Sequence, residues 1–256
     1  MIDLHCHLLP GVDDGPATLD EALALARAAL DDGITASVVT PHIHPGRYDN
    51  RLSLLQTRVQ AFRAALQRAG IALPVLLGAE VRVSLESLEL LQQGEVPYVG
   101  EVRGTRVLLL ELPHSHVPPG TQQLVRKLLD QNVRPLLAHP ERNKAFMDDP
   151  RRLDPLVGEG CWLQLTAGAV VGDFGRAAQR LAHRLLEEDQ VRVVASDAHN
   201  LAGRAPRMTA AREYIGQHWG ADLADELLLH NPLQMVGAAL QALPAAAPPR
   251  AARGRA

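Results

Sequence analysis

Two histidines one residue apart open the chain, and two aspartates follow within a few residues. Residues 2–7 are expected to form a short buried strand, and alternate side chains of a strand share a face, so His5 and His7 should point the same way. A Pro-Gly turn then delivers Asp13 and Asp14 nearby. Imidazole nitrogens beside carboxylate oxygens suit a divalent metal ion. The alternative is a pair of partly buried structural histidines.

More histidines and carboxylates stand at or just beyond the carboxyl ends of the later predicted strands. With the opening pair, the candidate metal ligands are His5, His7, Asp14, His42, Glu80, Glu111, His139, Asp197 and His199. A set of histidines and carboxylates without cysteine favours Mn, Fe or Zn over calcium, and its size implies two or three ions. Bridged ions of this kind activate a water and clamp both oxygens of a phosphoryl displacement. Singly, each residue has a plainer role as a surface ion pair or helix cap; the series at successive strand ends favours the metal site.

Arginines follow two of these strand ends. Arg142 and Arg204 come a few residues after His139 and His199, where a guanidinium would meet a phosphate held at the metal ions. Arg207 is the next candidate, and solvent-facing loop arginines are the alternative. Three further histidines fall in loops out of step with the strand ends and are expected around the site or at the surface: His44, His114 and His116.

The elements that must position these residues alternate along the chain. Strands are expected over residues 2–7, 34–40, 73–80, 106–111, 134–138, 161–166 and 191–195. Helices are expected over residues 18–32, 51–69, 85–93, 121–131, 150–159 and 174–188. Apolar strands that alternate with helices predict a parallel α/β sheet. In an open sheet, polar strand ends would converge only at one crevice, whereas in a closed barrel all the carboxyl ends surround one mouth. Polar residues at nearly every carboxyl end therefore favour the barrel. We therefore expect a distorted TIM-like barrel of seven strand-helix units, with the metal site at the carboxyl ends of the strands.

One domain is expected over residues 1–243. Within it, residues 207–243 read as helices that pack across the outside of the barrel. Residues 244–256, PAAAPPRAARGRA, form a low-complexity tail that we expect to be disordered.

Composition excludes several other classes of protein. A net charge of −3 and an aromatic content of 3% argue against a nucleic-acid partner, and no apolar run has the length of a membrane helix. Neither Cys6 nor Cys161 has an arginine six positions on, as a cysteine-dependent tyrosine phosphatase requires. The two cysteines are better read as reduced thiols, which together with the absence of a signal peptide favours a cytoplasmic location.

Seven motifs, in order, resemble the polymerase and histidinol phosphatase (PHP) superfamily. They are DLHCHLLPGVDDG, TPH, GAE, LELP, AHPER, QLTAG and SDAHN, between residue 3 and residue 200. More narrowly, the chain resembles the bacterial protein tyrosine phosphatases of capsule and exopolysaccharide loci. The resemblance implies a distorted barrel with a trinuclear site, often loaded with manganese, which acts on the phosphorylated tail of a tyrosine kinase.

The resemblance also implies how the ligands divide among three ions. His5, His7, Glu80 and Asp197 would surround the first ion; Glu80, Glu111 and His139 the second; Asp14, His42 and His199 the third. Arg142 and Arg204 would hold the phosphoryl group. We therefore expect a protein tyrosine phosphatase that uses a metal-activated hydroxide, with a tyrosine kinase as its partner. The alternatives are a PHP phosphatase of a small phosphomonoester, such as histidinol phosphate or a nucleotide, and a non-catalytic regulatory module.

Overall fold

A computed structural model of the chain describes residues 1–243, so the predicted disordered tail lies outside the described residues. The strands are β1 (Ile2–Cys6), β2 (Ala36–Val39), β3 (His42–Ile43), β4 (Val75–Leu77), β5 (Glu80–Arg82), β6 (Gly100–Val102), β7 (Thr105–Glu111), β8 (Val133–Ala138), β9 (Trp162–Thr166) and β10 (Val191–Ala195). The longer helices are α1 (Leu19–Asp31), α2 (Leu52–Arg68), α3 (Leu85–Gln92), α4 (Thr121–Asp130), α8 (Arg176–Glu187), α9 (Thr209–Trp219) and α11 (Asn231–Gln241). The shorter ones are η1 (Pro140–Arg142), α5 (Lys144–Asp148), η2 (Pro150–Leu153), α6 (Asp154–Glu159), α7 (Ala167–Val171), α10 (Ala221–Asp225) and the π-helix η3 (Glu226–His230).

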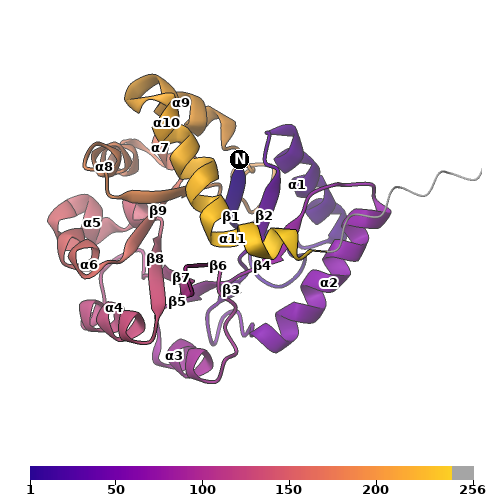
Figure 1. The fold of residues 1–256 in the computed structure, drawn as a ribbon, viewed down its shortest axis with the longest axis horizontal. Coiled ribbons are helices and arrows are strands. Elements are labelled where there is room, and N and C mark those ends of the chain that lie inside the picture. The colour runs from indigo at the N-terminus through magenta and orange to yellow at the C-terminus, as the bar shows by residue number, and fades with distance from the viewer. Residues whose placement is uncertain (244–256) are drawn as a thin grey trace, which may run out of the picture.

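Parallel strands close into the predicted barrel. Strands β1, β2 and β4 pair in that order, strands β3, β5, β7, β8, β9 and β10 pair in a second series, and each neighbouring pair within a series is parallel. The two series join where the chain passes from β2 into β3 and from β4 into β5. The seam between β1 and β10 is closed by backbone bonds just past the end of β10: Asp197 N donates to His5 O at 2.8 Å, and His7 N donates to Ala198 O at 2.8 Å. Helices surround the strands (Figure 1). The expectation of a distorted TIM-like α/β barrel is confirmed.

Two of the seven barrel positions are broken strands. The chain leaves β2 through Thr40 and Pro41 before β3 begins, and leaves β4 through Gly78 and Ala79 before β5 begins. A Cβ atom on Gly78 would lie 2.8 Å from Val99 Cγ1, so only glycine allows the backbone to pass this close. As a result, Glu80 begins β5, whereas the sequence placed it at the end of an unbroken strand.

The alternation of side chains along the first strand is interrupted, so that two adjacent side chains, one apolar and one polar, both point into the barrel. Its register against β2 shifts between Asp3 and Cys6, the signature of a bulge. Leu4 packs in the apolar cluster of the barrel interior, while the adjacent His5 contacts Gln164 of β9. The barrel is therefore apolar in its lower layers and polar at its carboxyl mouth.

The amino end of the barrel is closed by elements that the sequence did not place there. Strand β6 pairs antiparallel with β7 through a two-residue turn, Arg103 and Gly104, in which both φ angles are positive. Helix α11 crosses this end in Figure 1, and its residues Met235 and Val236 join the interior cluster. The sequence predicted helices across the outside; α11 instead covers the amino end. The apolar face of α11 packs against the apolar side chains at the amino end of the barrel.

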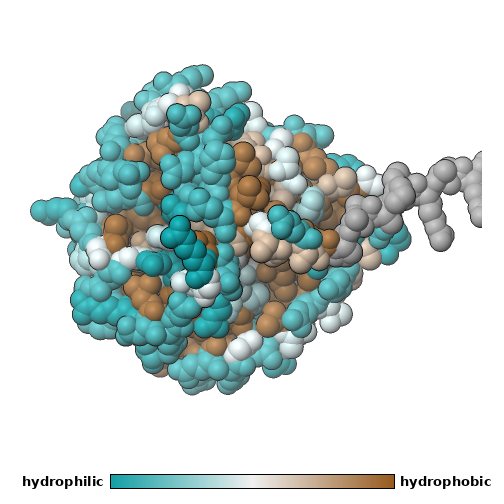
Figure 2. Space-filling view, viewed as in Figure 1, coloured by the Kyte–Doolittle hydropathy of each residue, from teal (hydrophilic) through white to brown (hydrophobic). Residues whose placement is uncertain are grey.

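Figure 2 shows this same face, where polar side chains cover most of the periphery and hydrophobic residues show between the helices and beside α11. Among residues 1–243, no helix combines the length and the apolar character needed to cross a membrane.

Candidate metal centre

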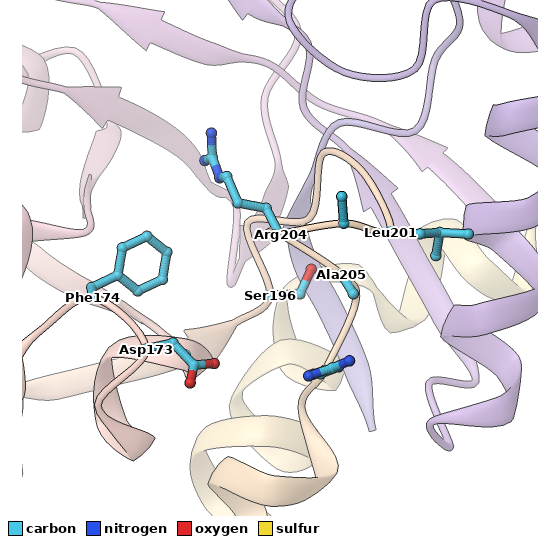
Figure 3. A pocket seen from close by; sticks show the side chains of 10 residues that line it. Asp173, Phe174, Ser196, Leu201, Arg204 and Ala205 are labelled. Carbon is cyan, nitrogen blue, oxygen red and sulfur yellow. The ribbon is translucent and has the colours of Figure 1, made fainter.

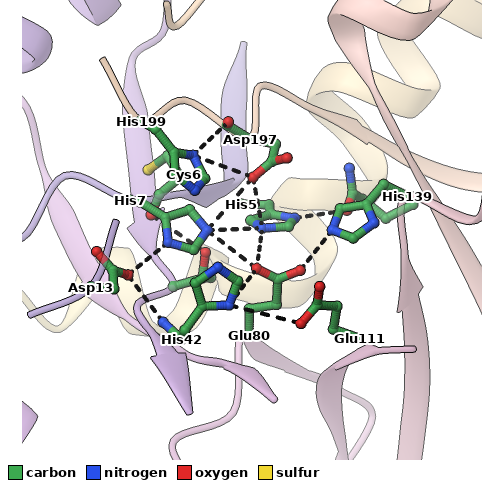
Figure 4. A network of polar contacts seen from close by, with 12 residues as sticks. His5, Cys6, His7, Asp13, His42, Glu80, Glu111, His139, Asp197 and His199 are labelled. Atoms are coloured by element: carbon green, nitrogen blue, oxygen red, sulfur yellow. Dashed lines mark hydrogen bonds and ion pairs between the residues drawn. The ribbon is translucent and has the colours of Figure 1, made fainter. Parts of the chain in front are cut away.

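All nine candidate ligands lie in one cluster at the carboxyl mouth of the barrel. Figure 4 labels eight of them, all except Asp14. The strand-end positions predicted from the sequence are therefore brought together in space. Seven of the nine are buried, whereas His42 is partly exposed and Asp14 is exposed. Two of the nine have left-handed backbone, His139 with φ of 35° and Asp197 with φ of 53°. Strain of this kind costs about 1–3 kcal/mol per residue and is concentrated at functional sites.

Four side chains converge most tightly. His5 Nε2 lies 3.2 Å from Glu80 Oε2 and 3.2 Å from Asp197 Oδ1, and His7 Nε2 lies 3.3 Å and 3.6 Å from the same two oxygens. Ligand atoms that each lie about 2.1 Å from one ion, at right or tetrahedral angles, are separated by about 3.0–3.4 Å. The four-residue group therefore has the spacing of a metal coordination shell.

The outer nitrogens of His5 and His7 determine what their inner nitrogens can do. His5 Nδ1 lies 2.8 Å from Gln164 Oε1, and His7 Nδ1 lies 2.7 Å from Asp13 Oδ2. Since both partners are acceptors, both Nδ1 atoms carry the proton, and in the neutral rings both Nε2 atoms are lone pairs. These two Nε2 atoms face each other at 3.2 Å, where two lone pairs repel. A cation between them would satisfy both, and a carboxylate or amide behind a ligating histidine is the usual arrangement around metals.

Two further groups adjoin the first. One comprises His7, Asp14, His42 and His199, with Asp14 Oδ1 3.3 Å from the Nε2 atoms of both His42 and His199. The other comprises His42, Glu80 and Glu111, with His42 Nδ1 3.1 Å from Glu80 Oε2 and 3.9 Å from Glu111 Oε2. His139 approaches the other oxygen of Glu80, with its Nε2 atom 2.7 Å from Oε1. Glu80 thus touches histidines of every group.

Several of these atoms have no hydrogen-bond partner within the described part of the chain. Four buried ones belong to the cluster: His42 Nδ1, Glu80 Oε2, Asp197 Oδ1 and His199 Nε2. Buried polar atoms are rarely left unpaired, because an unpaired one costs about 1–3 kcal/mol. Orphaned atoms that gather at one mouth of the barrel from three parts of the chain fit bound cations, so the donor set matches the divalent metal ions expected from the sequence.

Charge is strongly perturbed across the cluster. Burial opposes ionisation of Asp197, yet His5, Arg142 and Arg204 outweigh it and hold the pKa of this carboxyl well below its usual range. Glu80 behaves alike, since His5, His42 and His139 overcome burial and lower its pKa. For His139, burial and the charge of Arg142 lower the pKa to about 4. The structure therefore favours neutral His139 beside ionised Glu80, which are the protonation states that a metal ion requires.

Both predicted phosphate arginines reach the cluster. The guanidinium groups of Arg142 and Arg204 each form an ion pair with Asp197 Oδ2. Arg207, the next candidate, does not; it lines a small adjoining pocket of about 90 Å³ together with Arg204 and Phe174 (Figure 3). Glu141, beside Arg142 in the sequence, is buried and accepts a bond from Thr166 N at 2.8 Å. Burial raises the pKa of Glu141 to about 7.

The cysteines play no part in the cluster's polar contacts. Cys6 and Cys161 are both free and buried. Burial raises the pKa of the Cys161 thiol to about 12 and that of Cys6 well above its ordinary value. Neither thiol is poised to ionise as a nucleophile near neutral pH.

Comparison with known families agrees with this geometry. Residues 1–237 match the model of the family described as "Capsular polysaccharide synthesis, CpsB/CapC". The chain belongs to the CpsB/CapC family. It is 34% identical over 237 residues to the tyrosine-protein phosphatase YwqE of Bacillus subtilis, covering 90% of this chain and 92% of the relative. It is 30% identical over 241 residues to the tyrosine-protein phosphatase CpsB of Streptococcus pneumoniae, covering 92% and 98%.

Solved structures extend the CpsB/CapC likeness to the fold. A chain from the work "Crystal structures of YwqE from Bacillus subtilis and CpsB from Streptococcus pneumoniae, unique metal-dependent tyrosine phosphatases" superposes with a TM-score of 0.82 at 33% identity, covering 88% of this chain and 90% of that one. A mutant organophosphorus hydrolase superposes with a TM-score of 0.54 at 14% identity, covering 91% of each chain, a likeness of fold alone. The resemblance to the phosphatases of capsule loci is thereby confirmed at the level of the family.

Two residues of this CpsB/CapC centre, Gln164 and Arg82, were not predicted from the sequence, and Asp13 was predicted near the histidines but left out of the ligand set. Gln164 and Asp13 orient His5 and His7 from behind. Arg82 forms an ion pair with Glu111 at 2.8 Å, from Nη1 to Oε1. Each had a signal: Asp13 stands in the turn before Asp14, Gln164 is polar inside an apolar strand, and Arg82 is charged two residues after Glu80.

Proposed function

We propose that this chain is a metal-dependent protein tyrosine phosphatase whose metal ligands are the nine residues of the cluster. The observation that carries the proposal is the convergence of two imidazole Nε2 atoms, from His5 and His7, with unpaired carboxylate oxygens of Glu80 and Asp197. Its setting in a CpsB/CapC chain, whose relatives are tyrosine-protein phosphatases, supports the choice of substrate.

We assign the ligands to two or three ions. His5, His7, Glu80 and Asp197 hold one ion. Asp14, His42 and His199 hold another with His7 alongside, since these four donor atoms converge. Glu80, Glu111 and His139 hold the third; His42 also faces this position, 3.1 Å from Glu80. Manganese is the proposed metal, with iron or zinc as the other ions that this donor set accepts.

Divalent ions held by these residues would supply an activated water and neutralise the negative charge on the phosphoryl oxygens. The protein supplies the rest. Arg142 and Arg204 present guanidinium groups beside Asp197, where they hold a phosphoryl group in orientation and stabilise its charge. Since both cysteine thiols stay protonated, no cysteinyl phosphate forms on this chain.

The proposed partner is a phosphotyrosine protein, specifically a bacterial tyrosine kinase that governs capsular or exopolysaccharide synthesis and export. The capsular polysaccharide family supports this assignment. A cytoplasmic location is proposed with it, because both cysteines are free thiols, which is usual in a reducing compartment.

The test is hydrolysis of a tyrosine-phosphorylated peptide by metal-stripped protein, before and after addition of Mn²⁺, with His139→Ala as the matched variant. We expect activity to return with the metal and to fall at least 100-fold in the variant. Hydrolysis of histidinol phosphate or a nucleotide, without hydrolysis of the peptide, would show that the substrate is a small phosphomonoester. If the protein hydrolyses none of these esters, catalysis would be contradicted and a regulatory module favoured.

A further inference from the structure

Arg142 makes one notable contact besides its ion pair with Asp197: its guanidinium lies over the ring of Phe174. The distance from Arg142 Cζ to the ring centroid is 4.5 Å. The arginine side chain is only 15% exposed, so the contact is largely shielded from water. Phe174 belongs to no motif that the sequence analysis singled out, and it also lines the small pocket that contains Arg204 (Figure 3).

Stacking has a specific consequence for a phosphate-binding arginine. The N–H donors of a guanidinium lie in its plane, and a ring that covers the face leaves these donors free. An aromatic face thus holds the side chain in place without taking any hydrogen bond that Asp197 or a phosphoryl oxygen needs. It also reduces the rotamer freedom that would otherwise be lost when the anion binds.

Phe174 is held in place by the turn between α7 and α8. Asp173 N donates to Gly168 O at 2.8 Å, and the flanking residues Gly172 and Gly175 have φ angles of 97° and 86°. Gly168 itself, the glycine of QLTAG, is close to the ring: a Cβ atom added there would lie 3.0 Å from Phe174 Cε2. The ring is therefore fixed by backbone on one side and by Arg142 on its face.

We propose that Phe174 is a positioning residue that holds the Arg142 guanidinium with its donor edge toward the phosphoryl group. The proposal rests on the function proposed above, because it names how one of its two phosphate arginines is aimed. Its physical content is that the phosphate affinity of the site depends on an aromatic face at position 174, while the metal content does not.

The first experiment measures binding of inorganic phosphate to the manganese-loaded protein by calorimetry, with metal content determined on the same samples. Phe174→Leu keeps an apolar side chain of similar size and removes the aromatic face. We expect it to weaken phosphate binding about 3- to 30-fold, with the bound manganese unchanged. Phe174→Tyr, which restores the face, should stay within about twofold of the parent protein.

A matched control lies at the amino end of the barrel. Arg106 Cζ stacks 4.7 Å from the ring centroid of Tyr98, a similar pair far from the metal centre. Tyr98→Leu breaks that pair and should leave phosphate affinity unchanged. Equal losses in Tyr98→Leu and Phe174→Leu would overturn the proposal, since they would show a general effect of stability.

A double-mutant cycle separates positioning from packing. In an Arg142→Ala background, Phe174→Leu should have no further effect on phosphate affinity, because the group that it positions is gone. The same loss in both backgrounds would overturn the proposal. If Phe174→Leu proves too unstable to load with manganese, Gly168→Ala shifts the ring while phenylalanine is kept at position 174, and the same comparison with Arg142→Ala applies.

Turnover of a phosphotyrosine peptide completes the test. We expect the loss in phosphate affinity to appear in kcat/KM with a similar factor. Because the calorimetry does not depend on turnover, a protein that binds phosphate through Phe174 and Arg142 but hydrolyses no phosphotyrosine would refute the proposed substrate and uphold the positioning role.

Discussion

The histidines at the centre are oriented by the ring nitrogen that faces away from it. His5, His7 and His199 each direct one nitrogen to an oxygen acceptor: Gln164, Asp13 and the backbone oxygen of Asp197. Each acceptor fixes a proton on the outer nitrogen and so fixes a lone pair on the inner one. The ability of these inner nitrogens to bind a metal ion therefore depends on the oxygen acceptors that hold the outer nitrogens.

Asp13 offers the clearest test of this layer. Its Oδ2 accepts from His7 Nδ1 at 2.7 Å and from His42 N at 3.0 Å, so one carboxylate fixes two candidate ligands. We expect Asp13→Asn to weaken manganese binding about 10- to 100-fold, measured by competition with a chelator. Asp130→Asn, an exposed aspartate at the end of α4, is the control and should bind as the parent does. Equal affinities for Asp13→Asn and the parent would contradict the role.

At the scale of elements, the sequence reveals the candidate ligands because their chemistry is unusual at strand ends, but it does not reveal where strands break. The run from residue 73 to residue 80 reads as one strand, since its apolar pattern is continuous. The break at Gly78 is imposed by Val99, which arrives from a loop about twenty residues later. Strand β6 and its positive-φ turn at Arg103 escape prediction for a similar reason: local pattern does not specify a tertiary partner.

Gly78 makes the broken strand testable. An added Cβ would meet Val99 Cγ1 at 2.8 Å and Val38 Cγ1 at 3.0 Å, both in buried surroundings. We expect Gly78→Ala to reduce the free energy of unfolding by about 1–3 kcal/mol, measured by urea denaturation at fixed Mn²⁺ concentration. Gly158→Ala is the control: nothing lies within 4 Å of its Cβ position in α6, so it should be neutral or stabilising by up to about 1 kcal/mol. A Gly78→Ala protein as stable as the parent would refute the close approach.

Across the whole molecule, the two ends of the barrel differ in polarity. Helix α11 and β6 close the amino end with apolar packing, and the carboxyl end gathers buried charge. This division is typical of parallel barrels. The sequence predicts that α11 is a helix. It does not predict where α11 packs, because an amphipathic helix can cover the end of a barrel as well as its side. The carboxyl end carries buried carboxylates at Glu80, Glu111 and Asp197, whose ionised forms bound cations would stabilise.

Stability should therefore depend on metal. Ions that bind only the folded chain stabilise it by about 2.7 kcal/mol when present at 100 times Kd, or about 5–10 °C in Tm for a chain of this size. We expect EDTA to lower Tm by this amount and Mn²⁺ to restore it, with Tm measured by thermal unfolding. Glu80→Gln removes the carboxylate that touches histidines of all three groups, and it should lose most of the response to metal; Glu187→Gln, exposed on α8, should keep it. A full metal response in Glu80→Gln would show that the ions bind elsewhere, and an unchanged Tm in EDTA would show that the buried charge is balanced by Arg142 and Arg204 alone.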